Sequence, residues 1–364
     1  MAEAGRMKGG GTKVDGFANN SVAGLFLGLF LLALPQLTGT LTLYVSPNGN
    51  DEWSGRLPEP NKERTDGPLA SLEGARDAIR GLKRKGPLTE PVRVVVKGGL
   101  YTMTRPLVLT PEDSGTEDCP VTYEAAPGER PVFSGGRRIS GFRPIGGGIW
   151  AARIPEVAEG KWYFEQLYVN GRGAKRARLP NKFYFYVANK VPYGIDPATG
   201  RPANLERRAF QARLDDIRPL LKLPKEKLRD VTVVLYHSWA ISRLKILDID
   251  PRTGIVYLAG KSTWPILWWG PSQRYHLENF KEALDEPGEW FLDRDGTLYY
   301  WPLPGEDLTK AEVVAPVLDE FIRIEGEPEK GRWVEHVKFK GLSFRYAGYV
   351  LPPEGYSDPQ AACK

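Results

Sequence analysis

Two tryptophan-rich segments carry the residues best suited to recognising a ligand. His237-Ser-Trp239 precedes Arg243 by four residues, and Trp264-Pro-Ile-Leu-Trp-Trp-Gly270 places three tryptophans within six residues. A tryptophan ring stacks on the apolar face of a sugar ring, and a guanidinium donates hydrogen bonds to hydroxyl groups. We therefore predict that His237, Trp239 and Arg243 bind substrate, with Trp239 buried close to the arginine.

The same residues allow a second interpretation, in which Trp239 packs in the core beside a structural arginine. In the segment 264–270 exposed rings would form a binding platform, and we expect at least one of them to lie in the core. Tyr356 is a further predicted substrate contact, in a loop flanked by Glu354 and Asp358. These two acids either reach a sugar or belong to a solvated loop.

Carboxylate pairs are the groups that cleave glycosidic bonds, and they must lie roughly 5–10 Å apart with one of them held protonated. Asp285 and Glu289 are close in sequence, but Pro287-Gly288 between them predicts a tight turn. We expect Glu289 to accept backbone hydrogen bonds in that turn. Asp293 and Asp295 belong to a predicted hairpin turn.

Basic residues, histidines and cysteines exclude several other classes of protein. The excess of 50 Lys and Arg over 45 Asp and Glu is too thin and dispersed for a nucleic-acid-binding face. Lys175-Arg-Ala-Arg178 would suit nucleic acid or an acidic polysaccharide, but charges alternating along a strand are usually solvated, so we expect a solvated face. The cysteines and histidines are Cys119, Cys363, His237, His276 and His336. They lack metal-ligand spacing, so we expect no metal and no cofactor. The two cysteines are expected to be unpaired thiols, although a disulfide between them is the alternative.

The first 40 residues predict an export signal. The apolar run from Val22 to Leu34 is shorter than the roughly 20 residues that span a bilayer, but it matches the apolar part of a signal peptide. Small residues follow at Thr38-Gly39-Thr40. We therefore expect a secreted, periplasmic or cell-surface protein that meets a membrane only through this segment. A buried helix and an uncleaved anchor are the alternatives.

The segment 41–145 predicts a capping helix followed by short coils. Ser71 to Leu82 is amphipathic, with Ser71 as its cap. Brief apolar runs at 92–96, 107–109, 121–123 and 132–133 alternate with Gly- and Pro-rich corners. This is typical of three-sided coils, in which each face is a short strand, although a meander of short strands would look similar.

A different pattern occupies 146–310. Longer strands are predicted at 232–236, 241–249 and 255–257, and Trp290 to Trp301 forms a hairpin with Asp295-Gly296 at its turn. The charged stretch from Arg207 to Arg229 is helical or a long loop. This region predicts an inserted antiparallel β domain.

The short alternating runs return in 311–364, at Phe321–Gly326 and Val337–Phe344. Alternation predicts which residues face the coil interior: Phe321, Ile322 or Ile324, Val337, Phe339, Leu342 and Phe344.

Several motifs resemble secreted bacterial proteins with the pectate-lyase-like, right-handed parallel β-helix fold, specifically glycoside hydrolases of the β-xylosidase, xylanase and α-fucosidase type. The motifs are Tyr44–Asp51 with Asp66–Leu72, Val94–Tyr101, Gln166–Gly171 with Arg176–Asn181, and Glu278–Asn279 with Leu284–Asp285, Pro287–Trp290 and Leu298–Pro302. The resemblance implies an all-β fold: a right-handed parallel β-helix with an N-terminal capping helix and an inserted antiparallel β-sandwich-like domain.

The resemblance also implies hydrolysis of a plant or algal polysaccharide or oligosaccharide. The catalytic carboxylates of such enzymes follow the insertion, so they are expected beyond Lys364, and the chain itself is expected to have little hydrolase activity and an uncovered coil edge near Phe344. A non-catalytic glycan-binding or structural protein is one alternative. A polysaccharide lyase is another, and it would need a Ca²⁺ site of clustered carboxylates.

Overall fold

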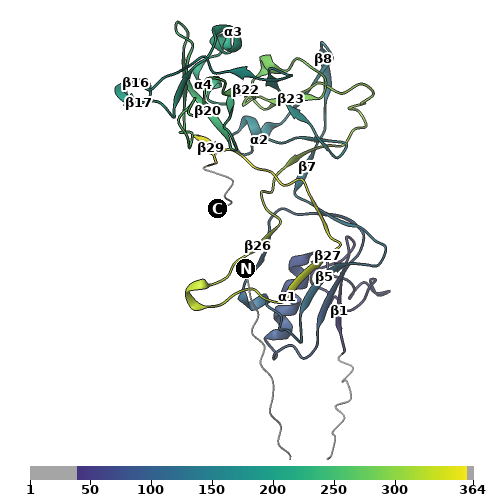
Figure 1. Ribbon diagram of the computed structural model, residues 1–364. Helices are drawn as coiled ribbons and strands as arrows, with labels where there is room; N and C mark the ends of the chain where they lie inside the picture. The colour runs from purple at the N-terminus through teal and green to yellow at the C-terminus, as the bar shows by residue number, and fades with distance from the viewer. Residues whose placement is uncertain (1–38, 359–364) are drawn as a thin grey trace, which may run out of the picture. The chain divides into compact units, whose positions relative to one another are not determined.

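The computed structural model describes residues 39–358, which are mostly β-structure (Figure 1). The predicted signal segment and Cys363 lie outside these residues. None of the described helices is long and apolar enough to span a membrane.

Strands from the early and the late part of the described chain form three parallel sheets. The first contains β1 (Leu41–Val45), β2 (Val92–Val96), β5 (Val121–Ala125) and β27 (Val337–Lys340). The second contains β3 (Gly99–Thr102), β6 (Pro131–Ser134) and β28 (Ser343–Arg345), and the third β4 (Leu107–Leu109) and β26 (Ile322–Ile324). All of these strands pair in parallel, so each turn of the chain, here called a coil, adds a strand to successive sheets. The short runs predicted as coil faces are confirmed as strands.

The helix α1 (Leu72–Lys83) contacts β1 and β4, and Figure 1 shows it beside β1. Ser71 caps it by accepting the backbone N–H of Gly74, which confirms the predicted start. Leu72, Ala75 and Ile79 are buried in the core of the parallel sheets. The apolar stripe seen in the sequence therefore covers those sheets.

Aromatic side chains at equivalent positions of successive coils stack on one another. The ring centroids of Tyr101 and Phe133 lie 4.7 Å apart, those of Phe133 and Phe344 5.3 Å, and those of Tyr123 and Phe339 5.1 Å. These contacts confirm that Phe339 and Phe344 face the coil interior.

The sequence left open whether Ile322 or Ile324 faces the coil interior, and the structure favours Ile322. Ile322 packs against the coil core, whereas Ile324 is 63% exposed. Ile324 is the last residue of β26, and the chain then leaves the sheet for η4 (Pro328–Lys330).

Between β6 and β26 the chain forms larger, mostly antiparallel sheets. A four-stranded sheet has the order β11 (Arg172–Gly173), β10 (Tyr168–Val169), β25 (Val313–Pro316), β7 (Gly136–Ile139). A five-stranded sheet has the order β12 (Lys175–Arg176), β23 (Glu289–Leu292), β24 (Thr297–Tyr300), β9 (Ile149–Arg153), β8 (Arg143–Gly146).

The nine-stranded sheet carries the candidate site. Its order is β13 (Arg178–Leu179), β22 (Arg274–Glu278), β19 (Thr232–Tyr236), β20 (Ile241–Asp250), β21 (Ile255–Leu258), β18 (Ala209–Gln211), β15 (Asn189–Lys190). In addition, β14 (Phe185–Tyr186) pairs with β22, and β29 (Gly355–Ser357) pairs with β20. The strand β29 follows β28 of the parallel sheets, so the chain returns to this sheet after leaving it.

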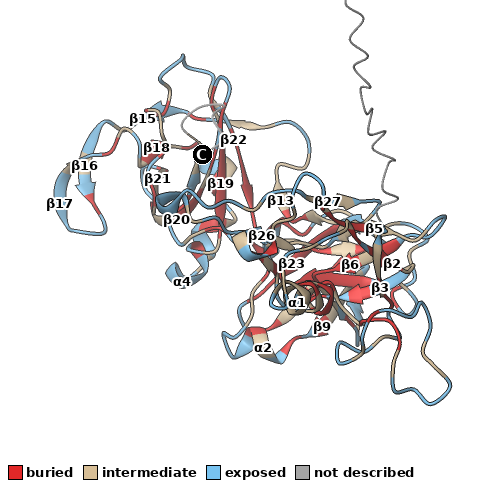
Figure 2. Ribbon diagram, turned by 90° about the horizontal axis from the view of Figure 1, so that it is seen from below, coloured by how far each residue is buried: buried red, intermediate tan, exposed pale blue. Residues whose placement is uncertain are grey.

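The remaining elements are short. They are the hairpin β16 (Tyr193–Asp196) and β17 (Arg201–Asn204), the helices α2 (Pro155–Ala158), α3 (Leu214–Ile217) and α4 (Lys225–Leu228), and the 3-10 turns η1 (Pro111–Asp113), η2 (Leu220–Lys222) and η3 (Lys281–Ala283). The charged stretch 207–229 thus contains a strand and short helices. Figure 2 shows β16 and β17 largely exposed, whereas buried residues follow the strands of the sheets.

Alternation gives the nine-stranded sheet one apolar and one polar face. In β22, Tyr275 and Leu277 belong to the apolar core, and the residues between them point to the other side. In β20, Leu244 and Ile246 are in the same core. The polar face therefore receives Arg243, Lys245, Arg274, His276 and Glu278.

The expectation that 175–178 forms a solvated face is wrong for Arg176. Its side chain is only 7% exposed and lies 3.3 Å from Glu165, with the guanidinium 5.6 Å from the ring centre of Trp290. Strand β12 pairs with β23, which places Arg176 opposite Trp290. The pairing of β12 with β23, invisible in the local charge pattern, buries this arginine.

Candidate functional site

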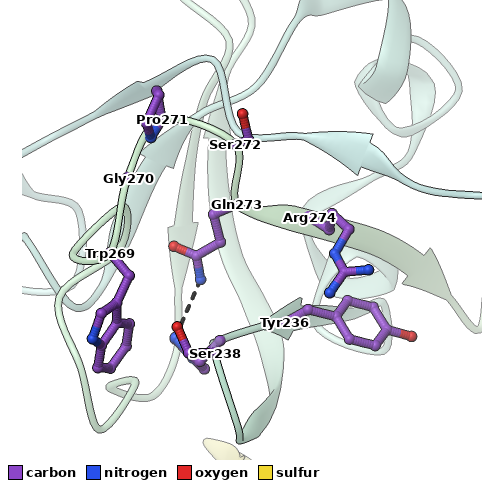
Figure 3. Close-up of a pocket in the computed structure, with 9 residues that line it drawn as sticks. Tyr236, Ser238, Trp269, Gly270, Pro271, Ser272, Gln273 and Arg274 are labelled. Atoms are coloured by element: carbon purple, nitrogen blue, oxygen red, sulfur yellow. Dashed lines mark hydrogen bonds between the residues drawn. The ribbon is translucent and has the colours of Figure 1, made fainter.

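A cavity of about 240 Å³ opens where β19 ends and β22 begins (Figure 3). Two chain segments line it, residues 236–238 and 269–274. The first overlaps the His237–Trp239 segment predicted from the sequence, and the second begins within the tryptophan-rich segment 264–270. The sheet thus brings the two sequence signals together.

Three tryptophans cluster beside the cavity. The rings of Trp239 and Trp269 meet edge to face with centroids 4.9 Å apart, and Trp264 lies 5.0 Å from Trp269. Trp239 is 51% exposed and Trp269 is 41% exposed. The prediction that Trp239 is buried is wrong, and so is the expectation that one of the later tryptophans lies in the core. The rings of Trp239 and Trp269 lie in loops between strands, outside the buried cores of the sheets.

His237 connects the tryptophan loop to the sheet. The Gln273 side-chain oxygen accepts the Leu267 backbone N–H at 2.6 Å, which turns its amide nitrogen toward Nδ1 of His237 at 3.2 Å. Burial lowers the pKa of His237, so the ring is neutral and its Nδ1 accepts. Nε2–H then donates to the Ser242 hydroxyl at 2.8 Å. Both ring nitrogens are engaged within the protein, so His237 positions the loop.

The hydrogen-bond chain continues into β29. The Ser242 and Ser357 hydroxyl oxygens are 2.7 Å apart, and Ser357 Oγ accepts the Thr263 backbone N–H at 2.8 Å. Residues from three distant segments therefore hold one loop.

Arg243 belongs to a second network, on the polar face of the sheet. It donates to Glu278 at 2.5 Å, and His276 Nε2 donates to the other carboxylate oxygen at 2.6 Å. These partners overcome burial and lower the pKa of Glu278 to about 2. Burial lowers the pKa of His276, whose Nδ1 accepts the Tyr236 hydroxyl at 3.2 Å. The network fixes the Tyr236 ring at the cavity.

Tyr356 lies directly opposite Arg243 in the pairing of β29 with β20, and it is 50% exposed. Opposite residues of an antiparallel pair share a face. The four predicted substrate contacts therefore divide into two groups. His237 and Trp239 lie at the tryptophan loop, whereas Arg243 and Tyr356 lie on the polar face.

The other carboxylates considered from the sequence have structural partners. Glu289 is fully buried and accepts the backbone N–H groups of Asp285 at 3.2 Å and Glu286 at 3.4 Å, which confirms its expected role in the turn. Burial raises its pKa, but its side chain has no access to solvent. Asp293 pairs with Lys227, and Asp295 accepts the Thr297 backbone N–H.

Glu354 lines a separate cavity of about 680 Å³. Within residues 39–358, no group of three or more His, Cys, Asp or Glu side chains has the arrangement needed to hold a metal ion. Cys119 is a buried free thiol of this part of the chain.

Sequence reasoning missed Tyr236, Gln273, Arg274, His276 and Glu278. A signal for three of them was present, because Arg274-Tyr-His-Leu-Glu278 alternates polar and apolar residues and so places 274, 276 and 278 on one face of a strand. Gln273 had no such signal, since its role depends on a fold that brings it to His237.

Comparisons with known proteins give one informative match. No family model matches the chain, and no curated protein does. A solved structure named "Glycoside hydrolase" matches with a TM-score of 0.71 and 27% identity, covering 88% of this chain and 53% of that one. A second, titled "The complex structure of XylC with xylose", covers 86% of this chain and 36% of that one with a TM-score of 0.37 and 15% identity.

The chain thus has a glycoside hydrolase-like fold and spans about half the length of the first of these structures. The second likeness is too low to carry an argument.

Proposed function

We propose that this chain is part of a carbohydrate-active protein of the glycoside hydrolase type, and that it binds a sugar in the cavity beside Trp269. The likeness to a solved glycoside hydrolase over 88% of the chain carries this proposal. It is supported by the exposed rings of Trp239 and Trp269 at a cavity in the matching fold.

The architecture of the family named above fits the parallel sheets. Strands from successive coils stack in register in three sheets, as in a parallel β-helix whose sides are short strands. We propose that the hand is right, because parallel crossover connections nearly always are. Export through the N-terminal apolar run, and a plant or algal polysaccharide as the substrate, belong to the same proposal.

The cavity has the size and surface of a sugar subsite. Its volume of about 240 Å³ is small beside the roughly 300–1,000 Å³ of most ligand pockets, which favours one sugar unit of a longer chain. Trp269 supplies an aromatic wall, and Ser238 and Ser272 supply hydroxyl groups. An aromatic wall beside a few polar groups is the usual way in which proteins bind a ring with one apolar face.

The cavity is better suited to binding than to bond cleavage. The nearby carboxylate, Glu278, keeps its charge because its pKa lies at about 2, so it cannot serve as a general acid near neutral pH. No Asp or Glu occurs in the lining segments 236–238 and 269–274. We therefore assign the cavity to substrate binding.

Calorimetric titration of the chain with xylo- and fuco-oligosaccharides tests this function. Trp269→Ala removes a stacking surface, and we expect the dissociation constant to rise about tenfold, from a loss of about 1–2 kcal/mol. Trp268→Ala is the matched control, because Trp268 is 61% exposed in the same loop but does not line the cavity. Absence of binding to any oligosaccharide, or equal losses in the two variants, would overturn the proposal.

A further inference from the structure

Arg274 lines the cavity and forms no ion pair with a carboxylate among the described residues. It begins β22 and lines the cavity, as Figure 3 shows. No carboxylate of residues 39–358 forms an ion pair with it, whereas Arg243 of the neighbouring network is paired with Glu278. The lining segments contain no Asp or Glu either. A positive charge therefore faces the cavity without an internal counterion.

Two tyrosine rings hold this arginine in place. Its guanidinium carbon lies 5.0 Å from the ring centre of Tyr184 and 5.6 Å from that of Tyr236, and the two rings meet edge to face at 4.8 Å. The Tyr236 hydroxyl is in turn fixed on His276. Contact with aromatic faces orients a guanidinium without using its N–H donors, so they stay available to a ligand.

The surroundings add to the positive potential. Burial raises the pKa of Tyr236, Glu278 raises it further, and the guanidinium groups of Arg178 and Arg243 lower it. Burial lowers the pKa of His276, so the imidazole contributes no charge near neutral pH. The carboxylate of Glu278 is paired with Arg243, so it forms no ion pair with Arg178 or Arg274.

We propose that the cavity selects a sugar unit carrying an oxyanion, either the carboxylate of a uronic acid or a sulfate ester, and that Arg274 is its specificity-determining residue. This inference rests on the proposed carbohydrate-binding function. A guanidinium binds either oxyanion through two parallel N–H···O bonds, which a neutral sugar cannot reciprocate. The sugar ring then stacks against Trp269, with the hydroxyls of Ser238 and Ser272 within the same cavity.

Calorimetry of the full chain with two matched pairs of ligands tests the assignment. One pair is a neutral xylo-oligosaccharide and the same oligosaccharide carrying glucuronic acid, and the other is a sulfated fuco-oligosaccharide and its desulfated form. We expect one acidic ligand to bind about tenfold more tightly than its neutral counterpart, because a charge-assisted bidentate contact is added. That advantage should shrink as NaCl rises from low concentration to roughly 0.5 M, where screening acts within about 3–5 Å. The ligand that gains identifies the oxyanion.

Arg274→Gln should abolish the advantage of the acidic ligand and leave neutral-sugar binding in place, which also shows that the variant is folded. Arg274→Lys should keep part of the salt-dependent advantage, since it retains the charge without the planar donor pair. Arg201→Gln, in the exposed hairpin β16–β17, is the matched control and should bind like the parent chain.

The outcomes separate this inference from the proposed function. Equal affinity of wild-type protein for acidic and neutral ligands overturns the oxyanion assignment and leaves sugar binding intact. A preference for acid that survives in Arg274→Gln overturns the role of Arg274. Failure of every oligosaccharide to bind removes the proposed function and this inference with it.

Discussion

The parallel coils and the nine-stranded sheet build their contacts in different ways. In the coils, residues at equivalent positions of successive turns meet, as Tyr101, Phe133 and Phe344 do. Around the cavity, His237 meets Gln273 on one side and Ser242 on the other, and these residues share no repeat. A repeated contact adds the same apolar burial in every coil, whereas contacts without a repeat can place different chemical groups around one ligand. Under the proposed function, the coils therefore act as a support and the residues around the cavity hold the sugar.

The largest expected effect lies in the coils. Phe133→Ala removes a ring that is 1% exposed and stacked between two others, and we expect the free energy of unfolding to fall by about 3–5 kcal/mol. Leu100→Ala, on the adjacent strand β3 and 60% exposed, is the control and should change it by less than about 0.5 kcal/mol. Urea unfolding followed by circular dichroism measures both, and similar losses would contradict a packed coil core.

The next largest loss of stability is expected from a substitution on the polar face of the nine-stranded sheet. Glu278→Gln removes a buried charge on which Arg243 and His276 converge, and we expect a loss of about 3 kcal/mol. Glu282→Gln, at an exposed position in η3, is the control. Urea unfolding near neutral pH distinguishes them, and a loss within error of the control would show that the network adds little stability.

The same network predicts a pH dependence. The pKa of Glu278 is about 2 in the folded chain against an ordinary 4.5, so its stabilisation is complete above pH 4.5 and is lost as pH falls toward 2. Burial lowers the pKa of His276 below its ordinary 6.5, so the unfolded chain binds that proton more readily and stability falls as pH drops below 6.5. Urea titrations from pH 7 to pH 3 should show both declines. A flat profile in the wild type, or a Glu278→Gln profile as steep as the wild type below pH 4.5, would contradict the assignment.

Breaking the hydrogen bonds by which His237 joins the tryptophan loop to the sheet should cause a smaller loss of stability together with a loss of binding. His237→Ala removes one hydrogen-bond partner from Gln273 and one from Ser242, and we expect a cost of about 1–3 kcal/mol. Affinity for oligosaccharide should fall as well, because the loop that carries Trp269 loses its attachment. Calorimetry and urea unfolding on the same preparations test this, and lost stability with unchanged affinity would show that the loop is held by other contacts.

The smallest loss of stability is expected from breaking the side-chain hydrogen bond between β29 and β20. Ser357→Ala removes the hydroxyl that faces Ser242, with an expected loss of about 1 kcal/mol. A double-mutant cycle with Ser242→Ala should show coupling of about 0.5–1 kcal/mol, since the two hydroxyls bond directly. Additive losses would mean that the two serines act independently.

Local patterns were enough to predict much of this protein. The helix α1 followed from its cap and apolar stripe, and the strands of the coils from short apolar runs between glycine-rich corners, because both depend on residues close in sequence. The hairpin turn at Asp295-Gly296 followed from turn chemistry, and Gly296 has the positive φ of 92° that such a turn requires. The tryptophan-rich segments were visible by composition alone.

Tertiary structure decided what these segments do. Whether Trp239 is buried depends on whether a second layer covers its loop, and Arg176 is buried because β12 pairs with β23. The pairing of β29 with β20 brings Tyr356 opposite Arg243, over more than a hundred residues of chain. The cavity forms because the end of β19 meets the start of β22, and this pairing also places Arg274 in its lining. Sequence determines the chemistry of each side chain and the local backbone preference, whereas contacts between distant strands determine which charges are left unpaired, and here that unpaired charge defines the proposed ligand.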